Sequence, residues 1–203
     1  MFAHTVNAYH HPNRLEIVFP AAILQAPFYD PVASYAENLG GIGAVIGHEF
    51  THGFDDQGAQ FDEHGNVVVW QTDEERAEFK KRAQLIVDQA DAFETLPGVH
   101  LQGELVLGEA IADVGGLQLA VEALQSRDAS EESLRGLFVN FARAECGQAT
   151  EELKVQLAKT DPHPPSRFRV NCVVNHIDDF YETYSVKPTD ALYRASDQRS
   201  QIW

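Results

Sequence analysis

Two histidines four residues apart, with a glutamate directly after the first, give this sequence its clearest chemical pattern, His48-Glu49-x-x-His52. The surrounding stretch, residues 40–54, is predicted to be helical, and residues four apart lie on one face of a helix. Such a face can present two imidazole nitrogens to one zinc ion, while the glutamate reaches a water molecule on the metal. The pattern therefore predicts a zinc site that still needs a third ligand, with Glu49 placed to reach a metal-bound water.

A downstream segment supplies candidates for the rest of the metal site. Glu109 and Asp113 lie four apart within residues 104–126, which are predicted to be helical, so their side chains share a face. One carboxylate can complete a His-His-Glu zinc site, and the other can fix the tautomer of a ligand histidine. A third histidine of the extended zinc motif is excluded, because its glycine and histidine positions hold Asp55 and Gly58. A structural zinc site is disfavoured, since no fourth protein ligand is evident.

Length and charge limit the class of protein. The chain has 203 residues, of which 44% are hydrophobic, so residues 1–203 are expected to form a single domain. The 31 acidic and 15 basic residues give a net charge of −16, which argues against binding nucleic acids or anionic membranes. No apolar run could span a bilayer and no leader opens the chain, so a cytoplasmic location is expected, with export as the alternative. Cys146 and Cys172 are expected to be reduced, with a single bridge as the alternative.

The elements that must position these residues are mainly helical. Short apolar stretches at 5–9 and 15–19 flank a Pro-Asn turn and predict a β-hairpin. Four glycines between 40 and 47 weaken the helix there and predict close packing against another element. Prolines predict a stiff loop around His163. The predicted helices are 40–54, Thr72 to about Glu94, 104–126, a helix opened by Ser130, and about Asn171 to Tyr181. We expect an α+β domain, mainly α, with a small antiparallel sheet.

Five motifs follow one another along the chain: Val6-Asn-Ala-Tyr9, Glu16-Ile-Val-Phe-Pro-Ala-Ala-Ile-Leu-Gln25, Gly40-Gly-Ile-Gly-Ala-Val-Ile-Gly-His-Glu49, Gly108-Glu-Ala-Ile-Ala-Asp113 and Thr160-Asp-Pro-His163. In type and order they resemble the catalytic lobe of the neprilysin and endothelin-converting-enzyme family of zinc endopeptidases. The resemblance covers nearly the whole chain. It implies a thermolysin-like zincin fold, one bound zinc ion, and cleavage of internal peptide bonds in oligopeptides.

The resemblance also implies roles in catalysis. Glu49 would take a proton from the metal-activated water and pass it to the leaving amine. His163 would stabilise the oxyanion. Asp113 and Asp55 would orient the ligand histidines. The zinc ligands implied are His48, His52 and Glu109.

Further matches imply how a peptide is held. Asn7 and Ala8 would bind the substrate backbone along the edge of a sheet. Arg169 would grip a backbone carbonyl on the leaving side. The pocket for the residue after the scissile bond would be lined by Ile23, Phe28 and Val45.

Departures from the family pattern bear on activity. Glu145 stands where family members often place tryptophan, so the specificity of the pocket is expected to differ. The ending Ser200–Trp203 lacks the family's terminal cysteine, which fits a bacterial member. The large helical domain that covers the family's active site is absent from this sequence. The alternative function is therefore an isolated lobe that binds zinc and peptides with little or no turnover. An uncovered cleft face also predicts weak self-association.

Overall fold

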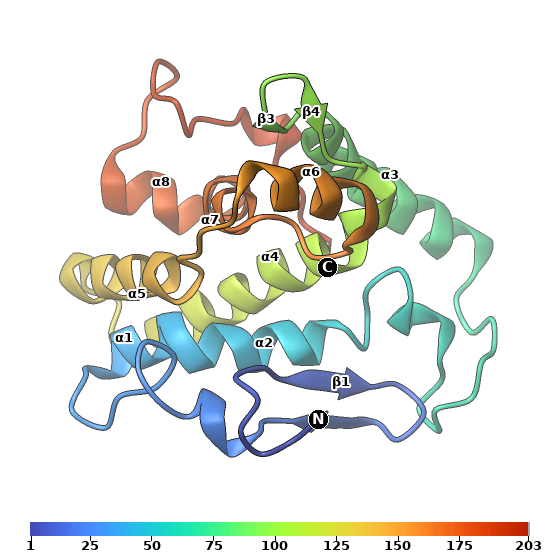
Figure 1. Cartoon of the computed structure of the whole chain (residues 1–203), viewed down its shortest axis with the longest axis horizontal. Coiled ribbons are helices and arrows are strands. Elements are labelled where there is room, and N and C mark those ends of the chain that lie inside the picture. The colour runs from blue at the N-terminus through green and yellow to red at the C-terminus, as the bar shows by residue number, and fades with distance from the viewer. Residues whose placement is uncertain (203) are drawn as a thin grey trace.

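The computed structural model describes residues 1–202, and Trp203 lies outside the described residues. Two short antiparallel hairpins and a set of helices make up this part of the chain (Figure 1). The strands are β1 (Tyr9–His11), β2 (Glu16–Val18), β3 (Glu94–Leu96) and β4 (Val99–His100). The helices are α1 (Tyr35–Asn38), α2 (Ala44–Thr51), α3 (Asp73–Asp91), α4 (Gly103–Gln125), α5 (Glu131–Ala144), α6 (Glu151–Thr160), α7 (Ser166–Val174) and α8 (Asp178–Tyr184). The expected class, mainly helical with a small amount of antiparallel sheet, is confirmed.

The first hairpin forms around the predicted Pro-Asn turn but is shorter than predicted. Tyr9 pairs with Val18 and His11 with Glu16, so residues 5–8 precede the sheet without joining it. In Figure 1 this hairpin lies below α2.

The second hairpin corrects the prediction of a helix to about Glu94. Helix α3 begins as predicted, because Thr72 and Glu75 form a capping box, but it ends at Asp91. Strands β3 and β4 follow, joined by a turn in which Gly98 has a φ of 75°. Glycine adopts positive φ without steric cost, so the Pro-Gly pair makes a hairpin turn here.

The C-terminal third contains more helix breaks than predicted. Helix α6 is not predicted, although Thr150 caps it by accepting a hydrogen bond from the N–H of Leu153. The predicted helix at 171–181 is two helices, because α7 ends at Val174 and α8 begins at Asp178. The loop between α6 and α7 carries His163 and contains the prolines, as predicted.

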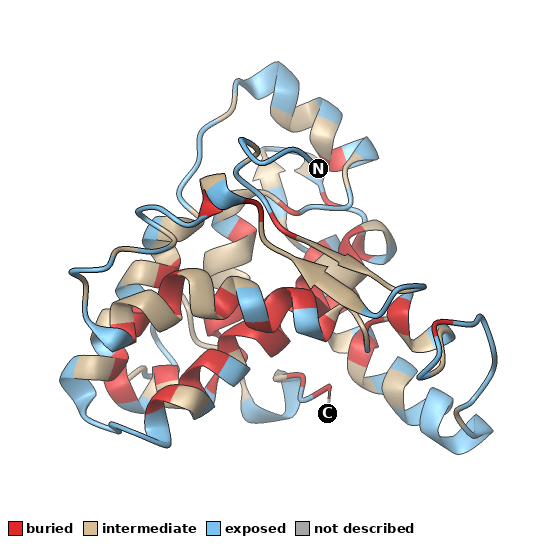
Figure 2. Ribbon diagram, turned by 90° about the horizontal axis from the view of Figure 1, so that it is seen from below, coloured by how far each residue is buried: buried red, intermediate tan, exposed pale blue. Residues whose placement is uncertain are grey.

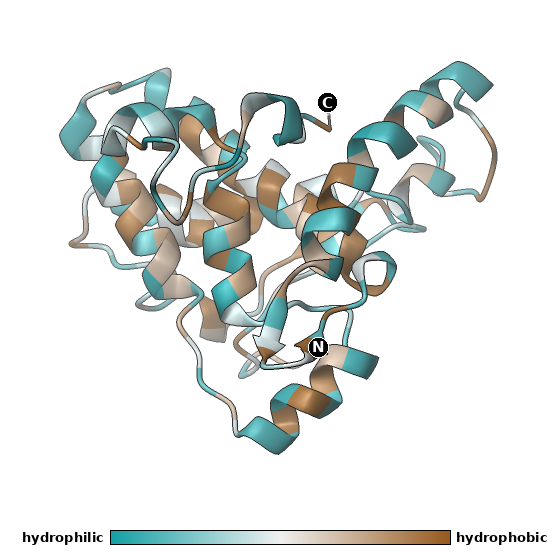
Figure 3. Ribbon diagram, turned by 90° about the horizontal axis from the view of Figure 1, so that it is seen from above, coloured by the Kyte–Doolittle hydropathy of each residue, from teal (hydrophilic) through white to brown (hydrophobic). Residues whose placement is uncertain are grey.

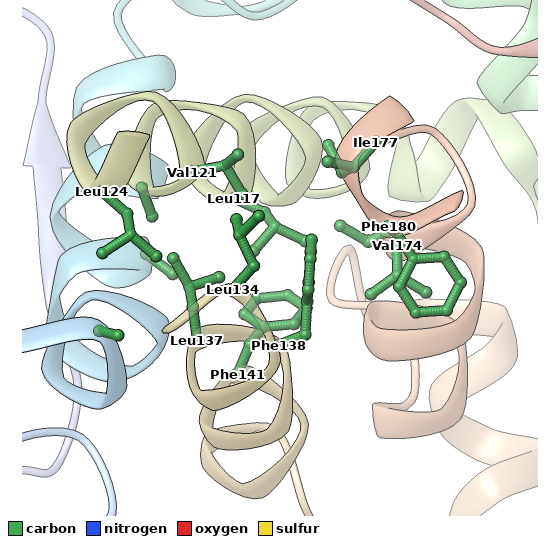
Figure 4. Packing of buried hydrophobic residues seen from close by; sticks show 14 of the residues in the cluster. Leu117, Val121, Leu124, Leu134, Leu137, Phe138, Phe141, Val174, Ile177 and Phe180 are labelled. Carbon is green, nitrogen blue, oxygen red and sulfur yellow. The ribbon is translucent and has the colours of Figure 1, made fainter. Parts of the chain in front are cut away.

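Helix α4 runs through the middle of the molecule and contributes to both hydrophobic cores (Figure 1). One core joins its second half to α5, α7 and α8, where Leu117, Val121 and Phe138 meet (Figure 4). The other joins its first half to α3 through Ile86 and Ile111. Buried residues are concentrated on these central helices (Figure 2), which also contain hydrophobic segments (Figure 3). Helix α4 bears on the predicted metal site because it carries Glu109 and Asp113.

Two further properties concern the whole described chain. Cys146 and Cys172 are both unpaired, Cys146 being exposed and Cys172 half-buried. Within residues 1–202, no helix combines the length and the apolar content that crossing a bilayer requires.

Candidate active site

The metal site is built where α2 packs against α4 at the distance that glycine allows. A Cβ added to Gly47 would lie 2.8 Å from the Cα of Gly116, and one added to Gly116 would lie 2.5 Å from the backbone N of His48. Real side chains do not tolerate such distances, so only glycine permits this contact. The predicted close packing of the glycine-rich segment is therefore confirmed. It brings the motif on α2 against the carboxylates on α4.

The three predicted zinc ligands converge. One donor atom from each of His48, His52 and Glu109 lies within 4.8 Å of the others. The Nε2 atoms of the two histidines are 3.0 Å apart. Glu109 places Oε2 3.3 Å from Nε2 of His48 and Oε1 3.6 Å from Nε2 of His52. Two imidazole nitrogens and one carboxylate match the donor set of a catalytic zinc site.

A carboxylate engages the outer nitrogen of each histidine. Nδ1 of His48 donates to Oδ1 of Asp113 at 2.8 Å, and Nδ1 of His52 donates to Oδ2 of Asp55 at 2.7 Å. These bonds place the proton of a neutral ring on Nδ1 and leave the Nε2 lone pairs facing the common centre. The predicted orienting positions of Asp113 and Asp55 thus coincide with the observed contacts.

Such a convergence of electron pairs fits a cation. Two Nε2 lone pairs 3.0 Å apart repel each other unless a positive charge lies between them. Oε2 of Glu109 is buried and has no hydrogen-bond partner among residues 1–202. A buried, unpaired carboxylate oxygen is costly unless an ion or proton satisfies it. The residues present therefore fit a zinc ion.

In the absence of a metal ion, the proposed zinc ligands bind a proton instead. Burial lowers the pKa of His48, but its hydrogen bond with Asp113 and its contact with the Glu109 carboxylate outweigh burial and raise that pKa to about 10. Burial raises the pKa of Glu109, yet its interactions with the histidines, led by His48, bring that pKa below its ordinary value. A proton and a metal ion compete for one electron-rich centre.

Glu49 lies beside this centre in the cleft. Its residue is 5% exposed, and burial raises the pKa of its carboxyl above the ordinary value. No side chain of residues 1–202 donates a hydrogen bond to its carboxylate, which is therefore available to a reactant. Its backbone carbonyl accepts a hydrogen bond from Nδ1 of His10, which ties β1 to α2.

His163 reaches the centre from the loop between α6 and α7. Its Nε2 lies 3.4 Å from Oε1 of Glu109, and its Nδ1 donates to Oδ1 of Asp161 at 2.8 Å. The same carboxylate oxygen accepts the backbone N–H of His163 at 2.9 Å. Asp161 thus fixes both the backbone and the ring of His163.

Arg169 on α7 contacts three carboxylates. It donates two hydrogen bonds to Asp113, and its Nη2 is 4.0 Å from Oε2 of Glu109. Its Nε lies 3.4 Å from Oε2 of Glu145. Burial raises the pKa of the Glu145 carboxyl, while the guanidinium opposes that rise. The Arg169 guanidinium also holds the pKa of Asp113 well below its usual range, against the effect of burial.

These groups line one cleft of about 500 Å³. All residues predicted to bind substrate line it, namely Asn7, Ala8, Ile23, Phe28, Val45 and Arg169. The side-chain oxygen of Asn7 accepts the N–H of Ala8 at 2.9 Å, directly before β1 begins. A volume of this size accommodates a few amino-acid side chains.

Two residues at the site receive no role from the sequence, namely Asp161 and His10, and the sequence links Glu145 to pocket specificity without indicating its partner Arg169. Asp161 stands two residues before His163, and an aspartate at that spacing commonly bonds the backbone ahead of it, so this role could have been predicted. The pairing of Glu145 with Arg169 joins residues on two helices and leaves no local pattern.

A helix bearing His-Glu-x-x-His, packed against a glutamate-bearing helix in a mainly helical α+β fold, defines the zincin class. The chain belongs to Peptidase family M13, whose family model matches residues 7–200. Neutral endopeptidase of Lactococcus lactis subsp. lactis is 42% identical over 203 residues, which is 100% of this chain and 32% of that protein. Human neprilysin is 39% identical over 214 residues, covering 99% of this chain and 28% of its own length. The resemblance seen in the motifs is thereby confirmed.

Solved structures agree with the sequence relatives. The Mycobacterium tuberculosis zinc metalloprotease ZMP1 in complex with inhibitor matches with a TM-score of 0.94 and 42% identity, covering 99% of this chain and 33% of that chain. PEPO from Lactobacillus rhamnosis matches with a TM-score of 0.94 and 35% identity, over 99% and 32% of the two chains. This chain spans about a third of the length of the relatives it matches.

Proposed function

We propose that this chain carries the zinc site of a metalloendopeptidase that hydrolyses internal bonds of oligopeptides. The observation that carries the proposal is the convergence of Nε2 of His48, Nε2 of His52 and the Glu109 carboxylate within one cleft. Proteins that match this chain over 99–100% of its length are named neutral endopeptidase and zinc metalloprotease. We further propose that a single zinc ion binds to these three residues.

A zinc ion at this centre supplies Lewis acidity, which polarises a scissile carbonyl and lowers the pKa of a water molecule. Glu49 takes the proton of the attacking water and delivers it to the leaving amine. Burial raises the pKa of its carboxyl, which favours the step in which the carboxylate accepts a proton.

His163 and Arg169 bind the substrate from outside the metal site. With carboxylates at both ring nitrogens, the imidazolium form of His163 has an acceptor on each side, and Nε2 can donate to a carbonyl oxygen that becomes negative. Arg169 commits Nε and Nη2 to Asp113, and residues 1–202 provide no partner for Nη1. Nη1 is therefore the nitrogen that would donate to a substrate carbonyl.

Peptide binding along β1 forms the remaining part of the proposal. Within residues 1–202, β1 pairs with β2 alone, and Asn7, Ala8, Tyr9 and His10 all line the cleft. An extended peptide could add to this edge by backbone hydrogen bonds, with Ile23, Phe28 and Val45 contacting its side chains.

A metal and activity assay tests the proposal. Metal analysis of dialysed protein should give about one zinc per chain, and the single variants His48→Ala, His52→Ala and Glu109→Ala should each lose most of it. Cleavage of a mixed peptide library should stop with a chelator and return with added zinc. A Glu109→Ala variant with full zinc occupancy would refute the ligand set.

The length difference from the relatives favours a second candidate, a lobe that binds zinc and peptides but turns over slowly or not at all. Stoichiometric binding of an uncleavable peptide mimic, together with undetectable hydrolysis, would identify it. Brisk hydrolysis of short peptides would exclude it.

We also propose weak self-association through the exposed cleft side of the molecule. Large apolar side chains are exposed on and after α2, notably Ile46, Phe50 and Phe54, which lie outside the lining of the cleft itself. Contiguous exposed apolar area commonly finds a partner. Light scattering over a dilution series should show a mass that falls with concentration, and a constant monomer mass would contradict this proposal.

A further inference from the structure

One half-buried carboxylate in the cleft has no role in the proposed mechanism. Glu145 directly follows α5 as its C-cap residue, and its side chain is 16% exposed. It lines the cleft, whose lining also includes the apolar residues Ile23, Phe28 and Phe141. Such a charged group among apolar walls must be satisfied by donors or counter-charges, or it weakens the fold.

The protein satisfies Glu145 only in part. Its one ion-pair partner among residues 1–202 is Arg169, with 3.4 Å between Oε2 and Nε. That N–H already donates to Oδ2 of Asp113 at 2.8 Å, so any second hydrogen bond from it to Glu145 is weak. No residue in the described range donates a hydrogen bond to the Glu145 carboxylate. Burial raises the pKa of this carboxyl, which is the expected sign for an undersupplied acid.

The charges that line the cleft also favour a positively charged ligand. Five carboxylates line it, belonging to Glu49, Asp55, Glu109, Asp113 and Glu145, against the single guanidinium of Arg169. With a divalent zinc ion bound, these six side chains and the metal would keep an excess of two negative charges. A positively charged substrate therefore binds this cleft more favourably than a neutral one. The net charge of −16 on the whole chain also attracts such a substrate.

The carboxylate also lies close to the reacting centre. Glu145 contacts Arg169, and Arg169 contacts Asp113 and Glu109, which surround the metal position. A side chain that reaches Glu145 from a bound peptide must therefore belong to a residue near the scissile bond. Lysine and arginine have the required form, because their methylene stems pack on apolar walls while the charged end meets a carboxylate.

We propose that Glu145 is a specificity-determining residue, which makes the cleft select peptides with a lysine or arginine next to the scissile bond. The inference rests on the proposed peptidase function, because it requires a peptide in the cleft. The apolar wall contacts the stem of the basic side chain, and the Glu145 carboxylate accepts hydrogen bonds from its ammonium or guanidinium group.

Uncleavable peptides measure this preference without relying on turnover. Two phosphinic peptides are compared, identical except for lysine or norleucine at the residue after the phosphinic group, and a second pair varies the residue before it. Dissociation constants are measured by calorimetry on the zinc-loaded chain. We expect one pair to show about tenfold or greater preference for lysine, because a hydrogen bond to a charged group in a partly buried site is worth at least that factor.

Variants at Glu145 assign the preference to its carboxylate. Glu145→Gln keeps the shape and removes the charge, so the lysine preference should fall below about threefold. Glu145→Leu should reverse it in favour of norleucine. Glu132→Gln is the matched control, because it removes one negative charge from an exposed position at the other end of α5 and should leave the preference unchanged. Circular dichroism and zinc content establish that each variant is folded and loaded.

Three results would overturn the inference: wild-type protein that binds norleucine peptides as tightly as lysine peptides, a preference that survives in Glu145→Gln, and a cleft that binds none of the four mimics. Failure of the proposed function is distinguishable, because it appears as absent hydrolysis of all peptides. A Glu145-dependent lysine preference in the mimics would support the inference even then.

Discussion

Arg169 donates two parallel hydrogen bonds to Asp113, from Nε to Oδ2 at 2.8 Å and from Nη2 to Oδ1 at 2.5 Å. Asp113 also accepts the Nδ1 hydrogen of His48, so one guanidinium on α7 holds the carboxylate that orients a proposed zinc ligand on α2. The sequence suggests only a substrate-gripping role for Arg169. The structure places the same residue behind the metal site as well.

Arg169→Ala should therefore destabilise the metal-free protein. Asp113 is 4% exposed, and loss of its guanidinium leaves a buried carboxylate with His48 as its remaining partner. Breaking a buried pair on one side costs on the order of 3 kcal/mol, measured here by urea unfolding with a chelator present. Zinc affinity should fall about tenfold or more, because His48 loses its fixed orientation. Arg169→Lys should lie between wild type and alanine, since lysine retains the charge but not the paired geometry. Unchanged unfolding in Arg169→Ala would contradict this role.

Glu49→Gln should retain zinc and fold while losing turnover. Glutamine preserves the shape of the side chain but cannot take a proton from water, and loss of a general base costs about a hundredfold or more. Zinc content, thermal unfolding and initial rates on a peptide library check the three parts. Glu63→Gln, at an exposed position outside the cleft, is the charge-matched control and should behave as wild type. A Glu49→Gln variant with more than a tenth of the wild-type rate would exclude the assigned role.

The contact between α2 and α4 makes a prediction about packing. A Cβ at Gly116 would lie 2.5 Å from the backbone N of His48 and 2.6 Å from the carbonyl of Ala44, so Gly116→Ala must push the helices apart. Overpacking of this kind costs about 1–3 kcal/mol and moves Glu109 away from the histidines. Both stability and zinc affinity should fall. Gly136→Ala on α5 is the control, since its Cβ would meet atoms no closer than 3.8 Å. It should be neutral or stabilise by up to about 1 kcal/mol, because alanine favours helix. Equal behaviour of the two variants would refute the argument.

Local patterns account for most of what the sequence predicts about this molecule. His48, Glu49 and His52 follow from helical spacing, and capping signals at Thr72 and Ser130 place the starts of α3 and α5 correctly. These features depend on residues within a few positions of one another.

The sequence does not predict contacts between residues that are far apart in the chain. Pairing of Arg169 with Asp113 spans 56 positions and depends on how α7 packs against α4, which no periodicity reveals. Sequence reasoning also overlooks α6, because its few buried positions give a weak apolar pattern even though Thr150 caps it. The break between α7 and α8 comes at Asn175, whose carbonyl accepts the hydroxyl of Tyr181, a contact visible only once both helices are placed.

The last prediction concerns His176, a buried histidine distant in sequence from the metal motifs. Its Nδ1 accepts the backbone N–H of Ser200 at 2.8 Å, so a neutral ring carries its proton on Nε2, which donates to Oε1 of Gln89 at 2.7 Å. Burial, with the nearby charges of Arg194 and Arg199, lowers the pKa of His176 to about 3.

A depressed histidine pKa makes the protein less stable in acid. The unfolded chain takes up this proton near pH 6.5, whereas the folded chain resists it, so the stabilising contribution is complete above pH 6.5 and is lost as pH falls toward 3. Its slope approaches about 1.4 kcal/mol per pH unit in that range. His176→Gln can keep both hydrogen bonds but does not titrate. Urea unfolding with a chelator, at pH 7.5, 6 and 5, should show that the stability of wild type minus that of the variant decreases as pH falls. Comparison at equal pH cancels the titration of the zinc ligands, which both proteins share. A difference that stays constant between pH 7.5 and 5 would mean that His176 is protonated at its ordinary pKa, and its buried contacts with Ser200 and Gln89 would then need another explanation.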